Sequence, residues 1–367
     1  MSTPIDANTF RELVSGQQQG LAARAVRGLL NLLELPYFSV TLLRNFFYDS
    51  GVLPTYQLPI PIISVGNLTL GGTGKSPLVA WLGRFFLDQE LQPGIISRGY
   101  GQSGNGVNDE FLELAFRLPS VSHRLNRNRI AAAQDFLDSG NIDLLILDDA
   151  FQHRRIARNL DIVLLDALQP FGYEHIFPRG MLRESVTSLR RANVVFLSRA
   201  DLIDETQRRK IRDRVQILAP NILWGEIVHE PQSLLSISKN HTETQTQNQT
   251  KTETEISAIR GKRILAFCGI GNPNAFRQTL EHCEAEIVEL IPFPDHHQFN
   301  TEDINHLEKK AQQENVDSIL CTMKDFVKIE HLVSGTIPVH AVLINIRFLS
   351  GEEPFRKLLQ KQLPGQC

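Results

Sequence analysis

The stretch "ISVGNLTLGGTGKSPLVAWL", residues 63 to 82, places an apolar run, a glycine-rich turn and a helix-like run in direct succession. Its centre matches the phosphate-binding pattern G-x-x-x-x-G-K-[ST], except that Thr69 stands at the first glycine position. That position mainly shapes the turn, whereas the Gly-Lys-Ser end makes the phosphate contacts. The alternative, a plain strand-to-helix turn, would leave Lys75 and three glycines unexplained.

Several features of this turn favour phosphate binding. Pro77 suits a first helical turn, and the backbone N–H groups at a helix N-terminus attract phosphate oxygens. Lys75 would reach the β- and γ-phosphates of a nucleotide, and the Ser76 hydroxyl would coordinate magnesium. We therefore expect the nucleotide contacts at Thr69, Leu70, Gly71, Gly72, Thr73, Gly74, Lys75 and Ser76.

Short apolar runs recur along the chain, each followed by turn residues and a helix-like pattern. They read "IPIISVGN", "PGIISRGYG", "DLLILDDA", "DIVLLDA" and "NVVFLSRAD". Near-continuous Ile, Leu and Val without alternation is typical of parallel strands that are buried on both faces. Similar runs return after residue 259. The sequence therefore predicts an α/β fold: a mostly parallel P-loop NTPase-like sheet with flanking helices, followed by a second, smaller α/β domain.

The composition is that of an ordinary globular protein. A net charge of −3 over 367 residues gives no basic field, so we expect no nucleic-acid partner. The four cysteines are widely spaced, which fits a reducing compartment. From Asn240 to Glu255 no apolar side chain occurs, which predicts a disordered linker or a surface insertion. The expected domains are a helical segment (1–54), a P-loop core (55–238), a polar linker (239–258) and the second domain (259–367).

The segment from Leu21 to Pro54 is rich in Leu and Phe but is interrupted by charges. No run reaches the roughly 18 uncharged residues that crossing a bilayer requires. Arginines on a Leu-rich helix suit a helix that lies in the membrane interface. A helix that caps the protein's own core is the equal alternative.

Acidic pairs follow or precede the predicted strands. Asp148 and Asp149 end a buried strand, where open α/β sheets bind ligands and where P-loop enzymes hold their metal. A loop pair that caps the next helix is the alternative. Asp109 and Glu110 in "GVNDEFLELA", and His296 in "PDHHQFN", are ambiguous as bare sequence, because solvated surface residues would look the same.

Together these pieces resemble the tetraacyldisaccharide 4'-kinase (lipid A 4'-kinase) family. The resemblance rests on "VGNLTLGGTGKSP" (65–77), "SRGYG" (97–101), "NDEFLELA" (108–115), "LDDAFQHRR" (147–155), "PRGMLRES" (178–185), "CGIGNPNAF" (268–276), "FPDHHQF" (293–299) and "TMKD" (322–325). These motifs appear in the family's order. Ser76, Ala150 and Met323 depart from the commonest family pattern, and Ser76 keeps the metal-binding hydroxyl.

The resemblance implies transfer of the ATP γ-phosphate to the 4'-hydroxyl of a tetraacyldisaccharide 1-phosphate, giving lipid IVA, with ATP and Mg²⁺ as cofactors. It implies a catalytic dyad of Asp109 and His296, and a metal site formed by Ser76, Glu110, Asp148 and Asp149. It further implies a peripheral, monotopic protein at the cytoplasmic face of the inner membrane, bound through the N-terminal helix. The substrate's 1-phosphate needs cationic partners, for which Arg98, Arg129 and Arg183 are candidates.

Two other classes have weaker support. A P-loop GTPase or metallochaperone-type regulatory NTPase would read guanine with N-K-x-D, but the corresponding segment is Ser198-Arg199-Ala200-Asp201. A dinucleotide-binding oxidoreductase would need G-x-G-x-x-G, and "CGIGNPNAF" has Asn274 at the last glycine position.

Overall fold

The computed structural model describes residues 7–99, 109–239, 249–295, 297–333 and 337–363. The chain forms two compact units. Unit 1 comprises Met1–Tyr100, Arg117–His229 and Ile346–Cys367, and unit 2 comprises Gly101–Phe116 and Glu230–Asn345. Two long strands, β7 (Leu223–Lys239) and β12 (Val339–Ser350), begin in one unit and end in the other.

Unit 1 is built on a parallel sheet, as predicted. Its strands are β1 (Ile62–Asn67), β2 (Pro93–Ser97), β3 (Ser122–Leu125), β4 (Leu144–Asp148), β5 (Leu160–Asp166), β6 (Val194–Ser198) and the first part of β7. They lie in the order β7-β6-β5-β1-β4-β2-β3, and each neighbouring pair is parallel. The apolar runs that predicted strands became β1, β2, β4, β5 and β6. The polar edge strand β3, whose sequence is Ser-His-Arg-Leu, has no such run.

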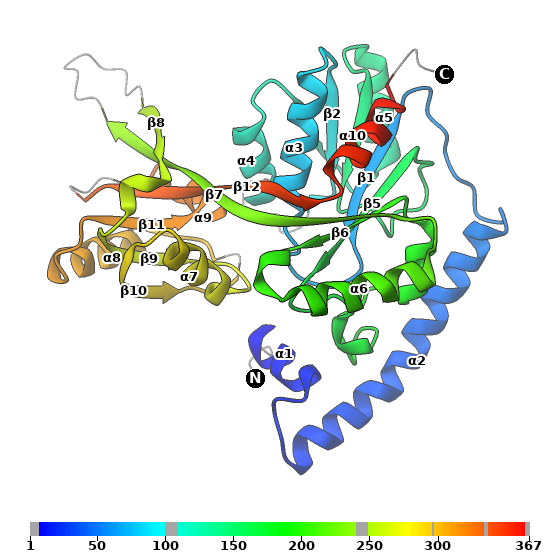
Figure 1. The fold of residues 1–367 in the computed structure, drawn as a ribbon, viewed down its shortest axis with the longest axis horizontal. Helices are drawn as coiled ribbons and strands as arrows, with labels where there is room; N and C mark the ends of the chain where they lie inside the picture. The colour runs from blue at the N-terminus through cyan, green and yellow to red at the C-terminus, as the bar shows by residue number, and fades with distance from the viewer. Residues whose placement is uncertain (1–6, 100–108, 240–248, 296, 334–336, 364–367) are drawn as a thin grey trace. The chain divides into compact units, whose positions relative to one another are not determined.

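Helices flank this sheet (Figure 1). They are α3 (Lys75–Leu87), α5 (Arg129–Ser139), α6 (Glu205–Leu218) and α10 (Glu352–Gln360), with short 3-10 turns at η1 (Gly172–Glu174), η2 (Val186–Arg191) and η3 (Ala200–Leu202). Phe136 of α5 packs with Ile96 and Leu145 of the strands, and Val215 of α6 packs in a second cluster with Val195. Both faces of the sheet are therefore covered, which explains why its strands are apolar throughout.

The C-terminal segment differs from the expected domain boundary, because it belongs to unit 1 rather than to the second domain. Phe355 of α10 is fully buried, and its ring stacks on Trp81 of α3 with centroids 5.7 Å apart. Phe348 makes an edge contact with the same tryptophan. Burial of these aromatic rings holds the C-terminal segment on unit 1.

Unit 2 is the smaller α/β unit that the sequence predicts. Its strands are β9 (Arg263–Cys268), β10 (Glu286–Pro292), β11 (Ser318–Thr322) and the first part of β12, in the parallel order β10-β9-β11-β12. Its helices are α7 (Pro273–His282), α8 (Thr301–Gln313), α9 (Met323–Ile329) and most of α4 (Asp109–Arg117), with the 3-10 turn η4 (Ile256–Ile259). Phe116 of α4 packs against the core of unit 2. Most of α4 therefore lies outside the P-loop core, although the predicted range of that core, 55–238, included it.

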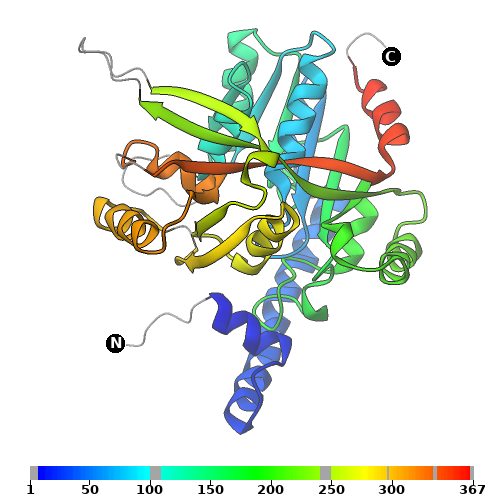
Figure 2. The same ribbon diagram turned by 60° about the vertical axis from the view of Figure 1, so that its left-hand side comes forward.

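The polar tract contains a strand. β8 (Gln249–Glu255) runs antiparallel to β7, with Ser233 opposite Glu255 and Lys239 opposite Gln249 (Figure 2). The expectation of a disordered linker over 239–258 is therefore wrong for this part, while residues 240–248 lie outside the described ranges. Backbone pairing with β7 stabilises this strand, whose sequence has no apolar residue to bury.

The N-terminal region is helical, with α1 (Ala7–Ser15) followed by the long α2 (Leu21–Asp49) (Figure 1). Of the 29 residues of α2, all of them described, Ala23 and Thr41 are buried. Its exposed apolar side chains are Leu21, Val26, Leu29, Leu32, Leu33, Leu35, Tyr37, Val40, Leu42, Leu43, Phe46 and Phe47. The alternative that this helix caps the core is thus wrong for most of its length. None of the helices in the described part of the chain has the length and apolar character needed to cross a bilayer.

Candidate active site

The glycine-rich turn connects β1 to α3 at the carboxyl edge of the parallel sheet. Gly74 adopts a left-handed conformation, φ +79°, and Lys75 begins the helix. Strand β4 lies beside β1 with Asp148 in register with Val65, so its acidic end reaches the same edge. The predicted nucleotide-binding residues and the predicted metal-binding strand end are thus neighbours, as ligand sites of open α/β sheets require.

Asn67, the last residue of β1, organises the first half of the turn. Its side-chain Nδ2 donates to the carbonyl oxygens of Thr69 (2.9 Å) and Gly71 (3.4 Å), and its Oδ1 lies 3.4 Å from Lys75 Nζ. Asn67 is fully buried, so its amide group needs these partners. The pattern match at residues 69–76 did not include this residue, although it directly precedes the turn.

The second half of the turn is held by the segment that follows β6. Arg199 Nη2 donates to the carbonyl of Gly72 at 3.0 Å, and Ser198 Oγ donates to the carbonyl of Thr73 at 2.8 Å. Because N–H and C=O point in opposite directions in a trans peptide, fixing these carbonyls orients the amides of Thr73 and Gly74 away from the braces. The Ser198-Arg199 segment therefore supports the loop, in place of the guanine recognition that the GTPase alternative would require.

His229 of β7 packs directly under the turn. A Cβ atom built at Gly74 would lie 2.0 Å from Cε1 of His229, so only glycine fits between the helix start and this ring. Burial, together with the positive charges of Arg199 and Arg117, lowers the pKa of His229 to about 3. The ring is therefore neutral near pH 7 and adds no positive charge beside the loop.

Lys75 is 9% exposed and is paired with Asp149, whose Oδ1 lies 3.3 Å from Lys75 Nζ. Arg183 Nη1 contacts both carboxylate oxygens of Asp149, at 2.8 and 3.0 Å. Burial raises the pKa of Asp149, but the charges of Lys75 and Arg183 outweigh that effect and lower the pKa well below its usual range. A carboxylate, a lysine and an arginine thus meet at the helix start, and Asp149 is ionised at neutral pH.

Asp148 is buried at the end of β4, and its Oδ2 accepts a hydrogen bond from Ser97 Oγ at 3.0 Å. Arg129, only 3% exposed, donates through Nη2 to the carbonyl oxygens of Asp148 (2.7 Å) and Asp149 (2.9 Å). Arg129 therefore fixes the turn after β4, and its contact with the substrate's phosphate stays a prediction. Arg98, by contrast, is exposed at the carboxyl end of β2.

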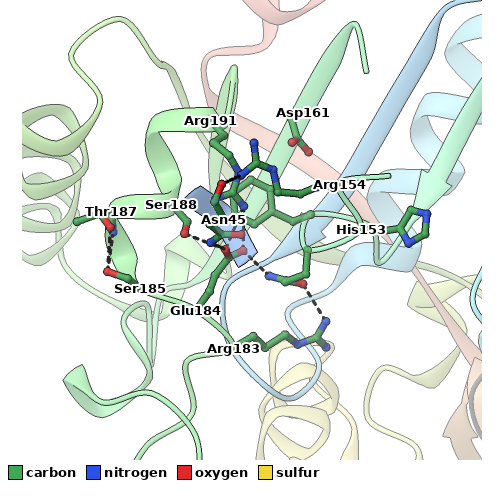
Figure 3. A network of polar contacts seen from close by, with 12 residues as sticks. Asn45, His153, Arg154, Asp161, Arg183, Glu184, Ser185, Thr187, Ser188 and Arg191 are labelled. Carbon is green, nitrogen blue, oxygen red and sulfur yellow. Dashed lines mark hydrogen bonds and ion pairs between the residues drawn. The ribbon is translucent and has the colours of Figure 1, made fainter. Parts of the chain in front are cut away.

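Glu184 is a functional candidate that sequence reasoning missed, although it lies inside the motif "PRGMLRES". Its buried carboxylate accepts hydrogen bonds from Asn45 of α2 (2.8 Å), Ser188 (2.8 Å) and Arg191 (3.0 and 3.1 Å) (Figure 3). Gln152 donates to it at 3.1 Å. Burial raises the pKa of Glu184, but the charge of Arg191 and these hydrogen bonds outweigh it and lower the pKa.

This network reaches the nucleotide turn. Gln152 Nε2 also donates to the backbone carbonyl of Asn67, and Gln152 Oε1 accepts from Arg183 Nη1 at 3.4 Å. Through Arg183 the network meets Asp149 and hence Lys75. Polar contacts therefore run without interruption from α2 to the P-loop.

The second acidic pair belongs to unit 2. Asp109, at the start of α4, lies 2.7 Å from Lys328 Nζ, and Glu110 accepts a hydrogen bond from Lys324 at 3.3 Å. His296 lies outside the described residues. Its neighbour His297 belongs to the same unit, and His297 Nε2 lies 2.9 Å from Asp303 Oδ2. Asp109 and His296 were expected on either side of a domain boundary, yet both fall within unit 2.

The predicted metal ligands, by contrast, are divided between the two units. Ser76, Asp148 and Asp149 lie in unit 1, whereas Glu110 lies in unit 2. Within the described ranges, no group of three or more His, Cys, Asp or Glu side chains is gathered as a metal site. Mg²⁺ typically takes one or two carboxylates together with substrate phosphates, so the Ser76 and Asp148 oxygens suit it without such a cage.

Known proteins give a consistent match. A family model described as tetraacyldisaccharide-1-P 4'-kinase matches residues 26–364. The tetraacyldisaccharide 4'-kinase of Syntrophus aciditrophicus is 33% identical, covering 87% of this chain and 88% of its own. That of Halothermothrix orenii is 32% identical, covering 95% and 96%.

Among solved structures, LpxK from Aquifex aeolicus in complex with ATP matches with a TM-score of 0.69 and 26% identity, over 92% of this chain and 99% of that one. The match extends across both units. This chain belongs to the tetraacyldisaccharide-1-P 4'-kinase family, and it is a kinase with the P-loop NTPase-like fold.

Proposed function

We propose that the protein transfers the γ-phosphate of ATP to the 4'-hydroxyl of a tetraacyldisaccharide 1-phosphate, with Mg²⁺. The observation that carries the proposal is the buried Lys75 at the start of α3, paired with Asp149 at the end of the neighbouring strand. A buried lysine beside braced backbone amides forms a cradle for a polyphosphate. Family membership identifies the acceptor.

The residues of unit 1 fit ATP and Mg²⁺. Lys75 would exchange its contact with Asp149 for the β- and γ-phosphates, and the braced amides of Thr73 and Gly74 would donate to phosphate oxygens. Ser76 and Asp148, with Asp149 beside them, supply the hard oxygen ligands that Mg²⁺ prefers. Bound Mg²⁺ would neutralise charge on the phosphates.

Unit 2 would act on the acceptor. The P–O bond to ADP breaks, a P–O bond to the 4'-oxygen forms, and Asp109 accepts the hydroxyl proton, with His296 as its partner. In a loose transition state the position of these groups matters more than their basicity. Glu110 would assist the metal, and Arg98, Arg129 and Arg183 are the candidates for the substrate's 1-phosphate.

The exposed apolar surface of α2 supports membrane binding, because a substrate with four acyl chains stays in a bilayer. We propose that α2 lies in the interface at the cytoplasmic face of the inner membrane. Glu34 and Asn45 attach the helix to the rest of unit 1, because they accept from the Ile176 N–H and donate to Glu184, respectively.

A label-transfer assay tests the activity. The protein is incubated with γ-labelled ATP, Mg²⁺ and disaccharide 1-phosphate lipid vesicles, and the lipid product is examined by phosphorus NMR. We expect label in the lipid and a second phosphomonoester at the 4' position. Label that stays in ATP, or is released only as inorganic phosphate, would reject the proposal.

Replacement of exposed α2 leucines tests the membrane part. Leu32→Asp combined with Leu43→Asp should weaken vesicle binding by about tenfold without lowering the thermal midpoint, because both side chains are more than half exposed. Ile217→Asp on α6, at an 80% exposed position, is the matched control and should bind as the wild type does. Equal vesicle binding by the wild type, the α2 double variant and Ile217→Asp would show that α2 does not bind the membrane.

A further inference from the structure

Lys328 of α9 is a buried lysine for which neither the motif analysis nor the proposed mechanism has a role. Its side chain is 7% exposed, and its Nζ lies 2.7 Å from Asp109 Oδ2. The same Nζ donates to the carbonyl oxygen of His297 at 3.2 Å and lies 3.7 Å from Asp325 Oδ1. An ammonium group has three donors, and three oxygens from separate segments surround this one.

The third of these oxygens is rigidly placed. Asp325 is fully buried, and its Oδ2 accepts hydrogen bonds from the backbone N–H of Gly269 (3.0 Å) and from Thr322 Oγ1 (2.6 Å). Thr322 is in turn the N-cap of α9, because its side chain accepts from the Asp325 N–H. Lys328 therefore extends from a fixed base that joins the ends of β9 and β11.

The second oxygen belongs to the residue that directly follows His296. This segment is held from other sides as well, since the His297 N–H donates to the Pro294 carbonyl at 3.0 Å and the His297 ring lies on Asp303. Lys328 thus contacts Asp109 on one side and the backbone next to His296 on the other.

We propose that Lys328 is the positioning residue of the phosphoryl transfer: it holds the Asp109 carboxylate and the His297 backbone in one arrangement. The proposal rests on the proposed function of Asp109 and His296. A neutral side chain at position 328 would leave Asp109 and the His297 carbonyl without their shared donor, and a displacement of about 1 Å is enough to cost much of the rate.

Lys324 provides a matched control on the same helix. It lies one turn before Lys328, its side chain is 30% exposed, and its Nζ lies 3.3 Å from Glu110 Oε1, whereas Lys328 Nζ contacts Asp109 and the His297 carbonyl. If a positive charge on α9 were all that mattered, Lys324→Met and Lys328→Met would have similar effects.

The test measures kcat and the KM for ATP and for lipid with Lys328→Met, Lys328→Arg and Lys324→Met in the full-length protein. We expect Lys328→Met to lower kcat by about 10- to 100-fold with the KM for ATP within twofold, and Lys328→Arg to recover much of the loss. Lys324→Met should retain at least a third of the wild-type kcat. A normal kcat in folded Lys328→Met, or equal losses in the two methionine variants, would overturn the proposal.

A double variant distinguishes a loss of positioning from a loss of folding in Lys328→Met. Asp109→Asn combined with Lys328→Met removes both charges of the pair, so no unpaired buried charge remains. Its kcat should match that of Asp109→Asn alone within twofold, because both changes disable one arrangement. Multiplied losses would contradict a shared role. The wild-type protein is measured in the same assay. If it phosphorylates the lipid, the proposed function holds and only the role of Lys328 is in question; if neither the wild type nor any variant transfers phosphate, the proposed function itself fails.

Discussion

Lys75 of unit 1 and Lys328 of unit 2 are both almost buried, and both pair with an aspartate, but they are assembled differently. Lys75 stands on a continuous stretch in which strand, turn and helix follow one another between Ile62 and Leu87. Lys328 meets Asp109 and His297, which lie 219 and 31 residues away. A local motif thus builds one cluster, and long-range packing builds the other, so the two lysines should serve different steps.

The largest expected effect separates these roles. Lys75→Met should lower kcat at least about 100-fold and weaken ATP binding about tenfold or more, because the charge that meets the phosphates is lost. Lys328→Met should leave the ATP dissociation constant within twofold. Titration of both variants with ATP, after a thermal-unfolding check, measures the difference. Equal loss of ATP affinity in both would show that the clusters are not functionally distinct.

A glycine in the nucleotide turn gives the next effect. Gly74→Ala should weaken ATP binding roughly tenfold, because the added Cβ would lie 2.0 Å from His229 and φ is +79°. The matched control is Gly140→Ala, which has φ +66° but no heavy atom within 4 Å of the added Cβ. This control should lose only about 1 kcal/mol of stability and bind ATP normally. Normal binding by Gly74→Ala would contradict the packing described for His229.

These residues also show what sequence could and could not predict. The apolar runs predicted β1, β2, β4, β5 and β6, and the pattern at 69–76 located the nucleotide turn, because each of these signals is contained in one short stretch. The turn is also braced by Ser198, Arg199 and His229, which come from the end of β6 and from β7. These residues are far from the turn in sequence, and only the order of strands in the sheet brings them near it.

The predicted domain boundaries differ from the observed units because these, too, depend on contacts between residues far apart in sequence. The C-terminal helix returns to unit 1 because Phe355 stacks on Trp81, and α4 joins unit 2 because Phe116 and Asp109 have partners there. Neither pairing leaves a periodic signal in the chain. The prediction of a disordered linker was wrong at β8 for another reason. Composition indicates how much apolar surface a segment can bury, but it does not reveal the backbone pairing that β8 makes with β7.

A glycine of unit 2 gives the smallest expected effect. A Cβ at Gly269 would lie 3.1 Å from Asp325 Oδ1 and 3.2 Å from the Pro294 carbonyl, so the base of the Lys328 cluster must shift by tenths of an ångström. Gly269→Ala should therefore lower kcat by roughly three- to tenfold while ATP affinity stays normal. Weaker ATP binding without a change in kcat would reverse the assignment of the two clusters.

The central claim is that Asp109 and His296 act as one acid–base unit within unit 2. Its most direct test is the kcat of Asp109→Ala, His296→Ala and the double variant at saturating magnesium-ATP, with folding verified for each. We predict losses of about 100-fold or more for each single variant, and little further loss in the double, because removing one member already disables the unit. Single variants with nearly wild-type turnover, or losses that multiply in the double variant, would contradict the account.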